Sequence, residues 1–306
     1  MDRTSQRLLK EDRVHGDVMF PLAAYWIELP AGTHILDTHW HEEAEFFLLQ
    51  EGEITFQVDT DYFPLKPGEA VFIESGDIHA AHVLKEGPCR FCALVFHQSL
   101  LASAQYDAIQ QSVILPLQEK RQSFPRHMTP EIPWQAELIA QLERMLEAYA
   151  IKMPGFEAFM KGTLLIMLSQ IVAAPGRAVN HSQSDSADTT KINRLKTVIL
   201  YIQENYREPI RLSDLSELIP MSEGQFSRFF KAMTRKTPVD YINSYRIRQA
   251  ADLLQQTDRK ISDIALEVGF DNVSYFIKVF RKGMKCSPSE FRKGEAPGAG
   301  QSQLYP

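Results

Sequence analysis

The 306-residue sequence contains only three cysteines, Cys89, Cys92 and Cys286. Three thiols cannot build the disulfide framework that holds many small secreted domains together. Cys89 and Cys92 lie in a strand-like apolar run, where residues three apart point to opposite faces, so the pair is not expected to share a metal ion. We therefore expect buried, reduced thiols that serve only in packing.

The sequence also lacks a long hydrophobic run. No apolar stretch follows a basic start at the N-terminus, which excludes the pattern of a signal peptide. The most apolar segment, 163–174, is too short to span a bilayer and contains Ser169 and Gln170. We expect a cytoplasmic protein with no membrane partner.

Charge is unevenly divided along the chain. Residues 190–294 contain 19 Lys and Arg against 12 Asp and Glu, a net charge of +7, whereas residues 1–189 contain 14 against 26, a net charge of −12. An acidic segment repels a phosphate backbone and a basic one attracts it. The division indicates that only the C-terminal part binds a polyanion such as DNA.

Hydrophobic periodicity changes once along the chain. Residues 18–97 alternate apolar and polar positions between Gly and Pro turns, which predicts short strands in a sandwich or barrel. The clearest strand segments are 44–50, 53–59, 69–75 and 90–97. Residues 98–132 give no pattern. We therefore expect a sensor barrel over residues 1–132.

Helical periodicity begins after Pro133 and predicts a helical pair over 133–174. One stripe of this pair carries four apolar residues, which we assign to dimerisation: Leu138, Leu142, Met145 and Tyr149. Packing against the barrel is the alternative use of the same stripe. The small polar segment 175–190 predicts a linker, residues 191–294 predict an all-α domain, and the tail 295–306 is expected to be disordered.

Two copies of one pattern occupy the helical C-terminal part, over 212–233 and 261–283. Each has a short apolar segment, a turn, and a second segment opened by a capping residue, as in a helix-turn-helix. The second helix of such a unit enters the major groove of DNA. Candidate DNA-binding residues on or next to these helices are Ser222, Gly224, Gln225, Ser227, Arg228, Lys231, Asn272, Val273, Ser274, Tyr275, Ile277 and Lys278.

Residues 192–293 resemble the DNA-binding domain of AraC/XylS-type transcription regulators. The stretches that carry the resemblance begin at Tyr245, Ile261, Ser274 and Ser287. It implies that the two second helices read bases. Two features depart from the family pattern, because Arg235 and Lys285 stand where the family usually has glycine after each recognition helix, and Gly224 replaces a larger side chain.

The N-terminal part contains a second constellation. His39, His41 and Glu45 lie on an alternating segment, and His79 follows a Gly-initiated run. Three imidazoles and one carboxylate are a set that can hold an octahedral divalent metal. The spacing resembles the two cupin motifs, although Glu74 and Val83 depart from the second motif.

Three interpretations of these residues compete: a metal-dependent enzyme, a small-molecule sensor, and a structural remnant. Sugar-binding barrels of AraC-type regulators resemble the sensor. Trp40 or Phe46 would supply an aromatic wall beside the polar groups.

We expect a multidomain α and β protein, with a cupin-like β-barrel, a helical pair and an all-α double helix-turn-helix domain. It is expected to be a dimeric, non-enzymatic transcription regulator that binds promoter DNA, RNA polymerase and a small-molecule effector, a sugar or sugar derivative. No cofactor is required by this hypothesis. The alternative is a metal-dependent cupin enzyme or metal sensor fused to a DNA-binding domain.

Overall fold

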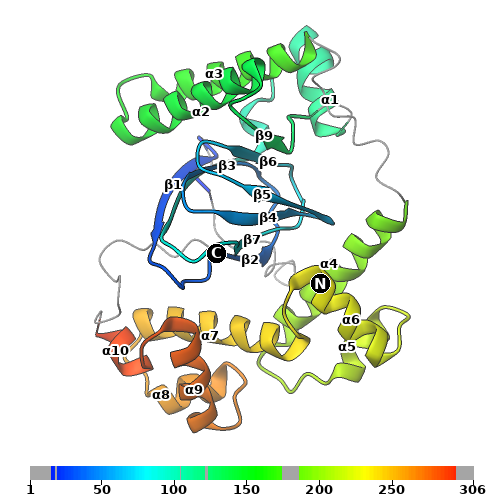
Figure 1. Ribbon diagram of the computed structural model, residues 1–306, viewed down its shortest axis with the longest axis vertical. Coiled ribbons are helices and arrows are strands. Elements are labelled where there is room, and N and C mark those ends of the chain that lie inside the picture. The colour runs from blue at the N-terminus through cyan, green and yellow to red at the C-terminus, as the bar shows by residue number, and fades with distance from the viewer. Residues whose placement is uncertain (1–14, 18, 104, 121–122, 174–185, 294–306) are drawn as a thin grey trace. The chain divides into compact units, whose positions relative to one another are not determined.

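The computed structural model describes residues 15–17, 19–103, 105–120, 123–173 and 186–293 (Figure 1). The chain divides between Thr189 and Thr190 into two compact units, each described here by itself. Within the described ranges no helix is both long enough and apolar enough to cross a bilayer. Most of the predicted linker and all of the predicted disordered tail lie outside these ranges.

The first unit is built on two antiparallel sheets (Figure 1). Its strands are β1 (Leu22–Leu29), β2 (Leu36–His39), β3 (Ala44–Glu51), β4 (Ile54–Val58), β5 (Asp61–Leu65), β6 (Ala70–Ile73), β7 (His79–Val83), β8 (Cys89–Phe96) and β9 (His127–Met128). One sheet has the order β1-β8-β3-β6-β9 and the other β2-β7-β4-β5. The four strand segments predicted from periodicity are confirmed as β3, β4, β6 and β8.

Strand β3 is buried on both faces, because every residue from Ala44 to Leu49 is at most 2% exposed. Phe47 and Leu49 point into the space between the sheets, while Phe46 and Leu48 point to the outer face. Phe46 therefore forms no wall beside Glu45, and the suggestion of an aromatic wall at this residue is wrong. Adjacent strand residues face opposite ways.

The two neighbouring cysteines obey the same alternation on β8. Cys89 belongs to the core between the sheets and Cys92 to the core on the outer face. Burial raises the pKa of the Cys89 thiol to about 11 and that of Cys92 to about 12. Both side chains stay protonated near neutral pH, which confirms the expected buried thiols.

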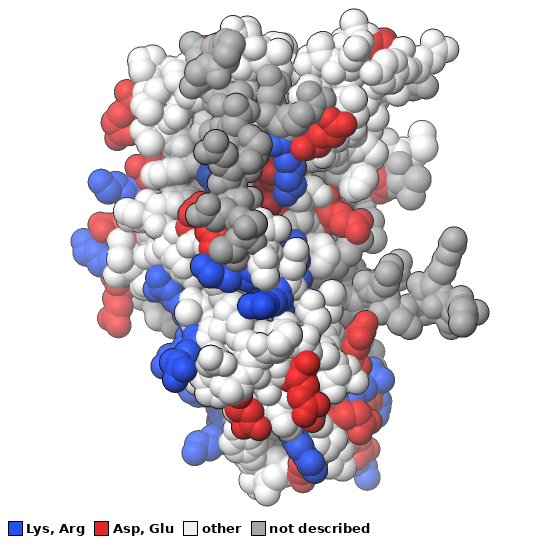
Figure 2. All heavy atoms as spheres, turned by 90° about the vertical axis from the view of Figure 1, so that its right-hand side faces the viewer, with Lys and Arg blue, Asp and Glu red and all other residues white. Residues whose placement is uncertain are grey.

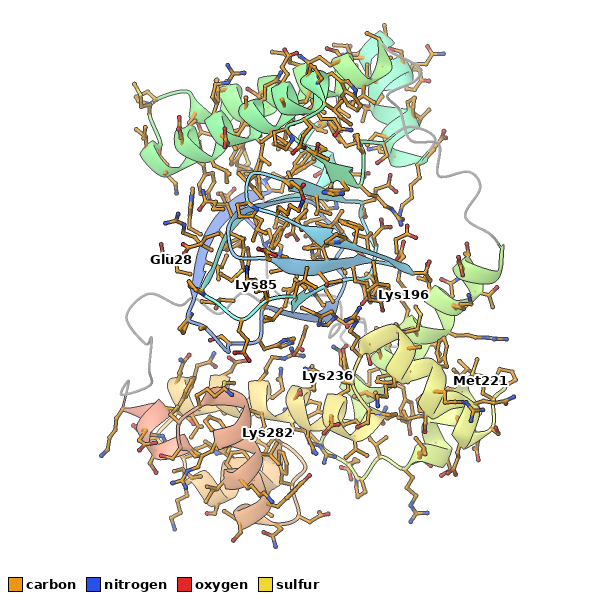
Figure 3. All side chains as sticks on the ribbon, in the orientation of Figure 1. Glu28, Lys85, Lys196, Met221, Lys236 and Lys282 are labelled. Carbon is orange, nitrogen blue, oxygen red and sulfur yellow. The ribbon has the colours of Figure 1, made fainter. Side chains whose placement is uncertain are left out.

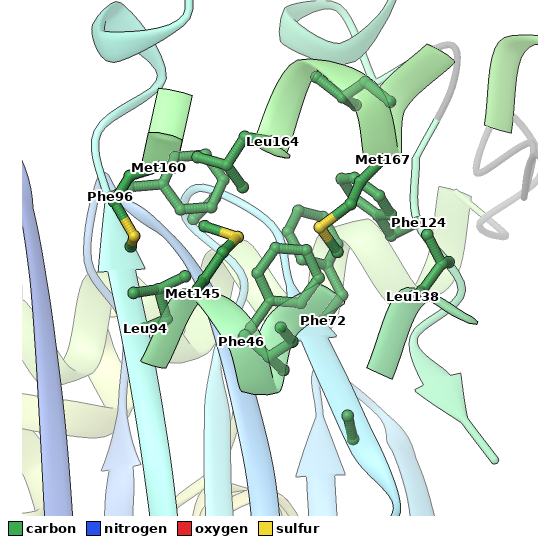
Figure 4. Close-up of a cluster of buried hydrophobic side chains, with 14 of the residues drawn as sticks. Phe46, Phe72, Leu94, Phe96, Phe124, Leu138, Met145, Met160, Leu164 and Met167 are labelled. Carbon is green, nitrogen blue, oxygen red and sulfur yellow. The ribbon is translucent and has the colours of Figure 1, made fainter. Parts of the chain in front are cut away.

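A helical pair covers the outer face of the five-stranded sheet. It consists of α2 (Pro133–Ile151) and α3 (Phe156–Val172). Between β8 and α2 the chain forms the 3-10 helix η1 (Gln98–Leu100), the π-helix η2 (Gln110–Ile114) and α1 (Leu115–Gln118). Met145 of α2 and Met160 and Met167 of α3 pack with the Phe46 side of the sheet in one apolar cluster (Figure 4).

This packing corrects the dimerisation assignment. Leu138 and Leu142 are each 1% exposed and Met145 is fully buried against the barrel of the same chain. Tyr149 is half-buried and contacts the rings of Trp26 and Phe156. The predicted stripe is real, but the protomer's own sheet covers Leu138, Leu142 and Met145, so these three side chains have no surface left for a second chain.

The second unit is entirely helical. Its helices are α4 (Ser186–Asn205), α5 (Leu212–Leu218), α6 (Glu223–Thr234), α7 (Pro238–Gln256), α8 (Ile261–Glu267), α9 (Val273–Met284) and α10 (Pro288–Arg292). Helix α4 begins five residues before the expected start at Lys191, so the predicted linker overlaps its first turn. Helix α7 joins the two helix-turn-helix pairs, α5–α6 and α8–α9 (Figure 1).

Both second helices of these pairs end in the same unusual way. Arg235 after α6 and Lys285 after α9 have left-handed backbone conformations, with φ of 55° and 60°. Glycine adopts this conformation without the steric cost that a side chain adds. The left-handed backbone conformation that glycine would favour is therefore kept in both helix-turn-helix pairs, with a basic residue in place of glycine.

Candidate DNA-binding surface and buried histidine site

Helix α6 begins with the predicted capping box. Ser222 Oγ accepts a hydrogen bond from the Gln225 backbone N–H, and Gln225 Oε1 accepts one from the Ser222 N–H at 3.1 Å. Phe226 and Phe230 are fully buried, which turns Arg228 and Lys231 outward, where both are exposed. The side chains of Ser222 and Gln225 thus fix the start of the helix that presents the arginine.

Other candidate positions on α6 behave as the helical period requires. Gly224 is exposed and Ser227 is half-buried, on the same side as Arg228. No atom lies within 4 Å of the point where a Cβ on Gly224 would stand, so this position leaves open space at the helix start. Any contact there involves backbone atoms alone.

Helix α9 repeats the arrangement with a different cap. Asn272 Oδ1 accepts a hydrogen bond from the Tyr275 N–H at 3.0 Å, and Phe276 and Phe280 are fully buried. Ser274 and Lys278 are exposed. Tyr275 is 47% exposed, and its hydroxyl accepts a hydrogen bond from Asn243 of α7 at 3.1 Å.

Two residues expected to face outward from α9 are partly used inside the protein. Val273 and Ile277 pack against the core that Phe276 and Phe280 help to form. The predicted outward face of α9 is therefore narrower than expected. Its accessible part is polar, and it centres on Ser274 and Lys278.

Charged side chains of both signs lie on the surface of the protein. On the face shown in Figure 2, basic and acidic side chains are interspersed rather than separated. Basic residues do gather near the C-terminal ends of both helices, with Lys231 in the last turn of α6 and Arg281 and Lys282 in that of α9. Lys236 follows α6 by two residues, and it and Lys282 are labelled in Figure 3. Such residues suit phosphate contacts that flank a groove.

In the first unit, the predicted histidine constellation forms a compact buried cluster. His39, His41 and His79 each offer a ring nitrogen, and these three atoms lie within 4.8 Å of one another. Glu45 Oε2 lies 3.0 Å from His41 Nε2 and 3.5 Å from His79 Nε2. All four side chains are buried, and Glu45 and His79 are fully buried.

Backbone carbonyls orient the three rings. His39 Nδ1 lies 2.8 Å from the Asp37 carbonyl, His79 Nδ1 lies 3.0 Å from that of Asp77, and His41 Nδ1 lies 2.9 Å from that of Glu43. A carbonyl only accepts, so each Nδ1 carries a proton. Each Nε2 then faces the centre of the cluster, and His39 Nε2 has no hydrogen-bond partner among the described residues.

The electrostatics of the cluster follow from burial and proximity. Desolvation lowers the pKa of His39 well below its usual value, and the neighbouring His79 and His41 lower it further. Hydrogen bonds from His41 and His79 hold the pKa of Glu45 well below its usual value, although burial alone would raise it. A neutral His39 beside an ionised Glu45 is the protonation pattern of a metal or hydrogen-bonding site.

An ion network holds the turn that delivers His79. The Asp77 carboxylate accepts from Lys120 Nζ at 2.8 Å and lies 3.4 Å from Arg126 Nη2, which also lies 2.9 Å from Asp59 Oδ2. Desolvation and the nearby Asp77 raise the pKa of Asp59. Lys120 and Arg126 thus hold Asp77, whose backbone carbonyl orients the His79 ring.

Both units match known families. A family model described as "Helix-turn-helix domain" matches residues 215–294, and one described as "Cupin domain" matches residues 25–96. The uncharacterized HTH-type transcriptional regulator YdeC of Bacillus subtilis is 26% identical over 93% of this chain and 96% of its own length. The chain belongs to the AraC-type transcription regulators.

Further relatives share parts or most of this AraC-type chain. The melibiose operon regulatory protein of Escherichia coli is 23% identical over 85% of each chain. The solved C-terminal domain of the two-component response regulator yesN from Fusobacterium nucleatum is 35% identical over 33% of this chain and 98% of its own, with a TM-score of 0.32. As an AraC-type regulator, the protein is a DNA-binding transcription regulator.

The structure of this AraC-type chain brings His39, His41, Glu45 and His79 together as expected, but it adds a residue that the sequence pattern missed. The His15 ring lies 5.7 Å from that of His41, and its Nδ1 lies 2.9 Å from the Tyr25 hydroxyl. His15 stands outside both cupin-like motifs, so no spacing signal marks it. Trp40 is half-buried, and strand alternation turns it away from its two histidine neighbours.

Lowering the pH should destabilise the metal-free protein through His39. Its pKa is depressed by folding, so the unfolded chain binds this proton first, and stability falls as pH drops from about 6.5 toward the lowered value. We expect a melting temperature that decreases over this window after chelator treatment, and a shallower decrease for His39→Gln. Equal slopes in the two proteins would contradict the assignment. His127→Gln, which changes a half-buried histidine on β9, is the matched control.

Proposed function

We propose that this AraC-type regulator binds a small polar metabolite, a sugar or sugar derivative, at the buried histidine cluster. Binding then changes how its DNA-binding unit occupies promoter sites. The observation that carries the proposal is a set of four polar side chains, three histidines and one carboxylate, buried together inside the barrel. One buried atom of the set, His39 Nε2, has no hydrogen-bond partner among the described residues. Burying such an atom costs free energy, which a ligand that completes its hydrogen bond would recover.

Two further observations support a ligand of this kind. Donors and acceptors converge at the cluster from separate segments, since His39 and His41 flank the end of β2, Glu45 lies on β3 and His79 begins β7. Hydroxyl groups of a polyol both donate and accept, which suits such a mixed site. A relative is also named for the melibiose operon, which places one sugar-related regulator among proteins similar to this chain.

A divalent cation is the second candidate occupant of the same cluster. Three Nε2 atoms converge with one carboxylate, and each Nδ1 is bonded to a backbone carbonyl, which is the usual second-shell arrangement of metal-bound histidines. The residues present therefore fit a metal. His39, His41, His79 and Glu45 would hold it, and the cation would supply a Lewis-acidic centre that polarises oxygen atoms of a bound ligand.

One experiment separates the two occupants. The full-length chain is treated with chelator, and its melting temperature is followed with a panel of mono- and disaccharides, or with Mn²⁺, Ni²⁺ and Zn²⁺. At 100-fold excess over Kd a specific ligand adds about 2.7 kcal/mol, a rise of roughly 5–10 °C. His79→Ala should abolish the rise, and His127→Gln should keep it.

The additive that raises the melting temperature identifies the occupant of the cluster. A sugar that stabilises without metal supports the sensor, whereas a rise with metal alone supports the cation. Stabilisation that survives His79→Ala would place the ligand elsewhere and contradict the proposal. If none of the additives shifts the melting temperature, the cluster has only a structural role and the proposal is contradicted.

We propose that DNA contacts come from the accessible faces of α6 and α9, to which Val273 and Ile277 contribute only the part of their surface that the core leaves exposed. The proposed contacts are Ser222, Gly224, Gln225, Ser227, Arg228, Lys231, Asn272, Val273, Ser274, Tyr275, Ile277 and Lys278. Among them Arg228 has the reach and charge to contact guanine with two hydrogen bonds. Promoter DNA and RNA polymerase are the macromolecular partners that this function requires.

Arg228→Ala should weaken binding to a selected DNA sequence by about 1–3 kcal/mol and relax base preference at one position. The measurement is a titration of the full-length chain with duplexes that vary at each position of a site enriched from random sequences. Arg144→Ala, an exposed arginine on α2, is the control and should bind as the wild type does. A uniform loss on all duplexes would show that Arg228 contacts phosphate instead.

We also propose that the regulator forms a dimer through the outer face of α3. Phe159 is 44% and Ile166 is 55% exposed, and seven residues apart they share one face of the helix. The neighbouring helix–helix turn exposes Ile151 and Met153 as well. A symmetric pair of such faces would bury this apolar surface.

Ile166→Glu should shift the full-length chain from dimer to monomer in sedimentation experiments, because it places a charge in the proposed interface. Met145→Ala should instead lower the free energy of unfolding by about 2–5 kcal/mol, since it opens a cavity in the protomer's core, and leave the oligomeric state unchanged. A dimer that persists in Ile166→Glu would rule out this face.

A further inference from the structure

The segment that directly follows α4, residues 206–208, lies against the second helix-turn-helix pair. Tyr206 is 6% exposed and belongs to the same core as Phe276 and Phe280 of α9. Its ring contacts that of Tyr245 on α7 at 5.1 Å, edge to face. The same segment leads directly into α5, which begins at Leu212 and opens the first pair.

Arg246 of α7 binds this segment by its backbone. Its Nε donates to the Tyr206 carbonyl at 2.7 Å and its Nη2 donates to the Glu208 carbonyl at 2.8 Å. The guanidinium carbon also lies 5.8 Å from the centre of the Phe270 ring. Phe270 belongs to the turn between α8 and α9. One side chain therefore joins the central helix, the segment before the first pair and the turn of the second pair.

Gly269 makes the close approach possible. A Cβ at this residue would lie 2.4 Å from the Tyr206 carbonyl oxygen and 3.0 Å from the Arg246 guanidinium carbon. Gly269 also has φ of +89°, and the Phe270 N–H donates to the Ala265 carbonyl at 3.0 Å to close α8. The turn between α8 and α9 thus presses on the segment with backbone alone.

We propose that Arg246 and Gly269 are positioning residues that set the spacing between the two DNA-binding helices. The first pair is joined to the second by α7 and, independently, by segment 206–211. Two separate connections resist a rotation that a single helix would permit. The consequence is a strict requirement for the distance between the two subsites in DNA. This inference rests on the proposal that both α6 and α9 contact DNA.

The test uses the full-length chain and a two-part site enriched from random duplexes. One inserted or deleted base pair between the parts rotates one subsite by about 36° and shifts it by about 3.4 Å. We expect the wild type to lose at least about tenfold in affinity on either altered duplex. The Arg246→Met variant should lose less than about threefold in affinity on the same altered duplexes, and its base preferences within each subsite should be unchanged.

Two further variants make the result specific. Arg248→Met removes the same charge from the same helix and should keep the wild-type spacing penalty. Arg246→Lys keeps the charge but lacks the forked donor that reaches two carbonyls, so its penalty should be intermediate. Should Arg246→Met fail to fold, as judged by circular dichroism, Arg246→Lys decides: a spacing penalty below that of the wild type supports the proposal, and a penalty equal to it contradicts the proposal.

Several outcomes would overturn the proposal. Arg246→Met could bind every duplex more weakly while keeping the full spacing penalty, which would reduce its role to stability. The wild type could tolerate the inserted base pair without loss, in which case no spacing is enforced. A wild type that enriches only one-part sites would refute two-helix DNA contact itself, which separates that failure from a failure of the Arg246 connection.

Discussion

Double burial of β3 is the constraint on which the fold of the first unit depends. A strand covered on both faces must serve two different surroundings, and consecutive residues are assigned to them in turn. Phe46 and Leu48 require an apolar cover, which α2 and α3 provide, and Phe47 and Leu49 fill the space between the sheets. Glu45 lies on the inner side, where its carboxylate is 3.0 Å from His41 Nε2 and 3.5 Å from His79 Nε2. The helical pair and the buried site are thus consequences of opposite faces of one strand.

The DNA-binding half solves a different problem, which is to hold two similar helices in a fixed relation. Each helix is anchored by two buried phenylalanines and started by a side-chain cap, so its outer face is defined locally. The relation between the pairs comes from α7 and from the carbonyls that Arg246 binds. The left-handed Arg235 and Lys285 mark the same position in both pairs, which indicates that the repeat extends to the backbone.

Much of this organisation could be predicted, and the errors have a common cause. Periodicity located the strands β3, β4, β6 and β8 and both helix-turn-helix pairs, because each depends on local alternation. The stripe on α2 was also correct, but an apolar stripe does not say which surface covers it. Leu138, Leu142 and Met145 were assigned to a second chain and instead meet the sheet of their own. Phe46 was placed beside the wrong residues for the same reason.

Taken alone, the sequence predicted the histidines and Glu45 that gather in the barrel, and the polar positions that follow each cap in α6 and α9. Their spacing along the chain is a local property, so it can be read from the sequence alone. Only the tertiary structure decided how they are used. It brought His15 to His41 from outside both motifs, linked Asp77 to Arg126 behind His79, and placed Tyr206 against Gly269. These contacts join segments that are distant along the chain, and no periodicity encodes a contact of that kind.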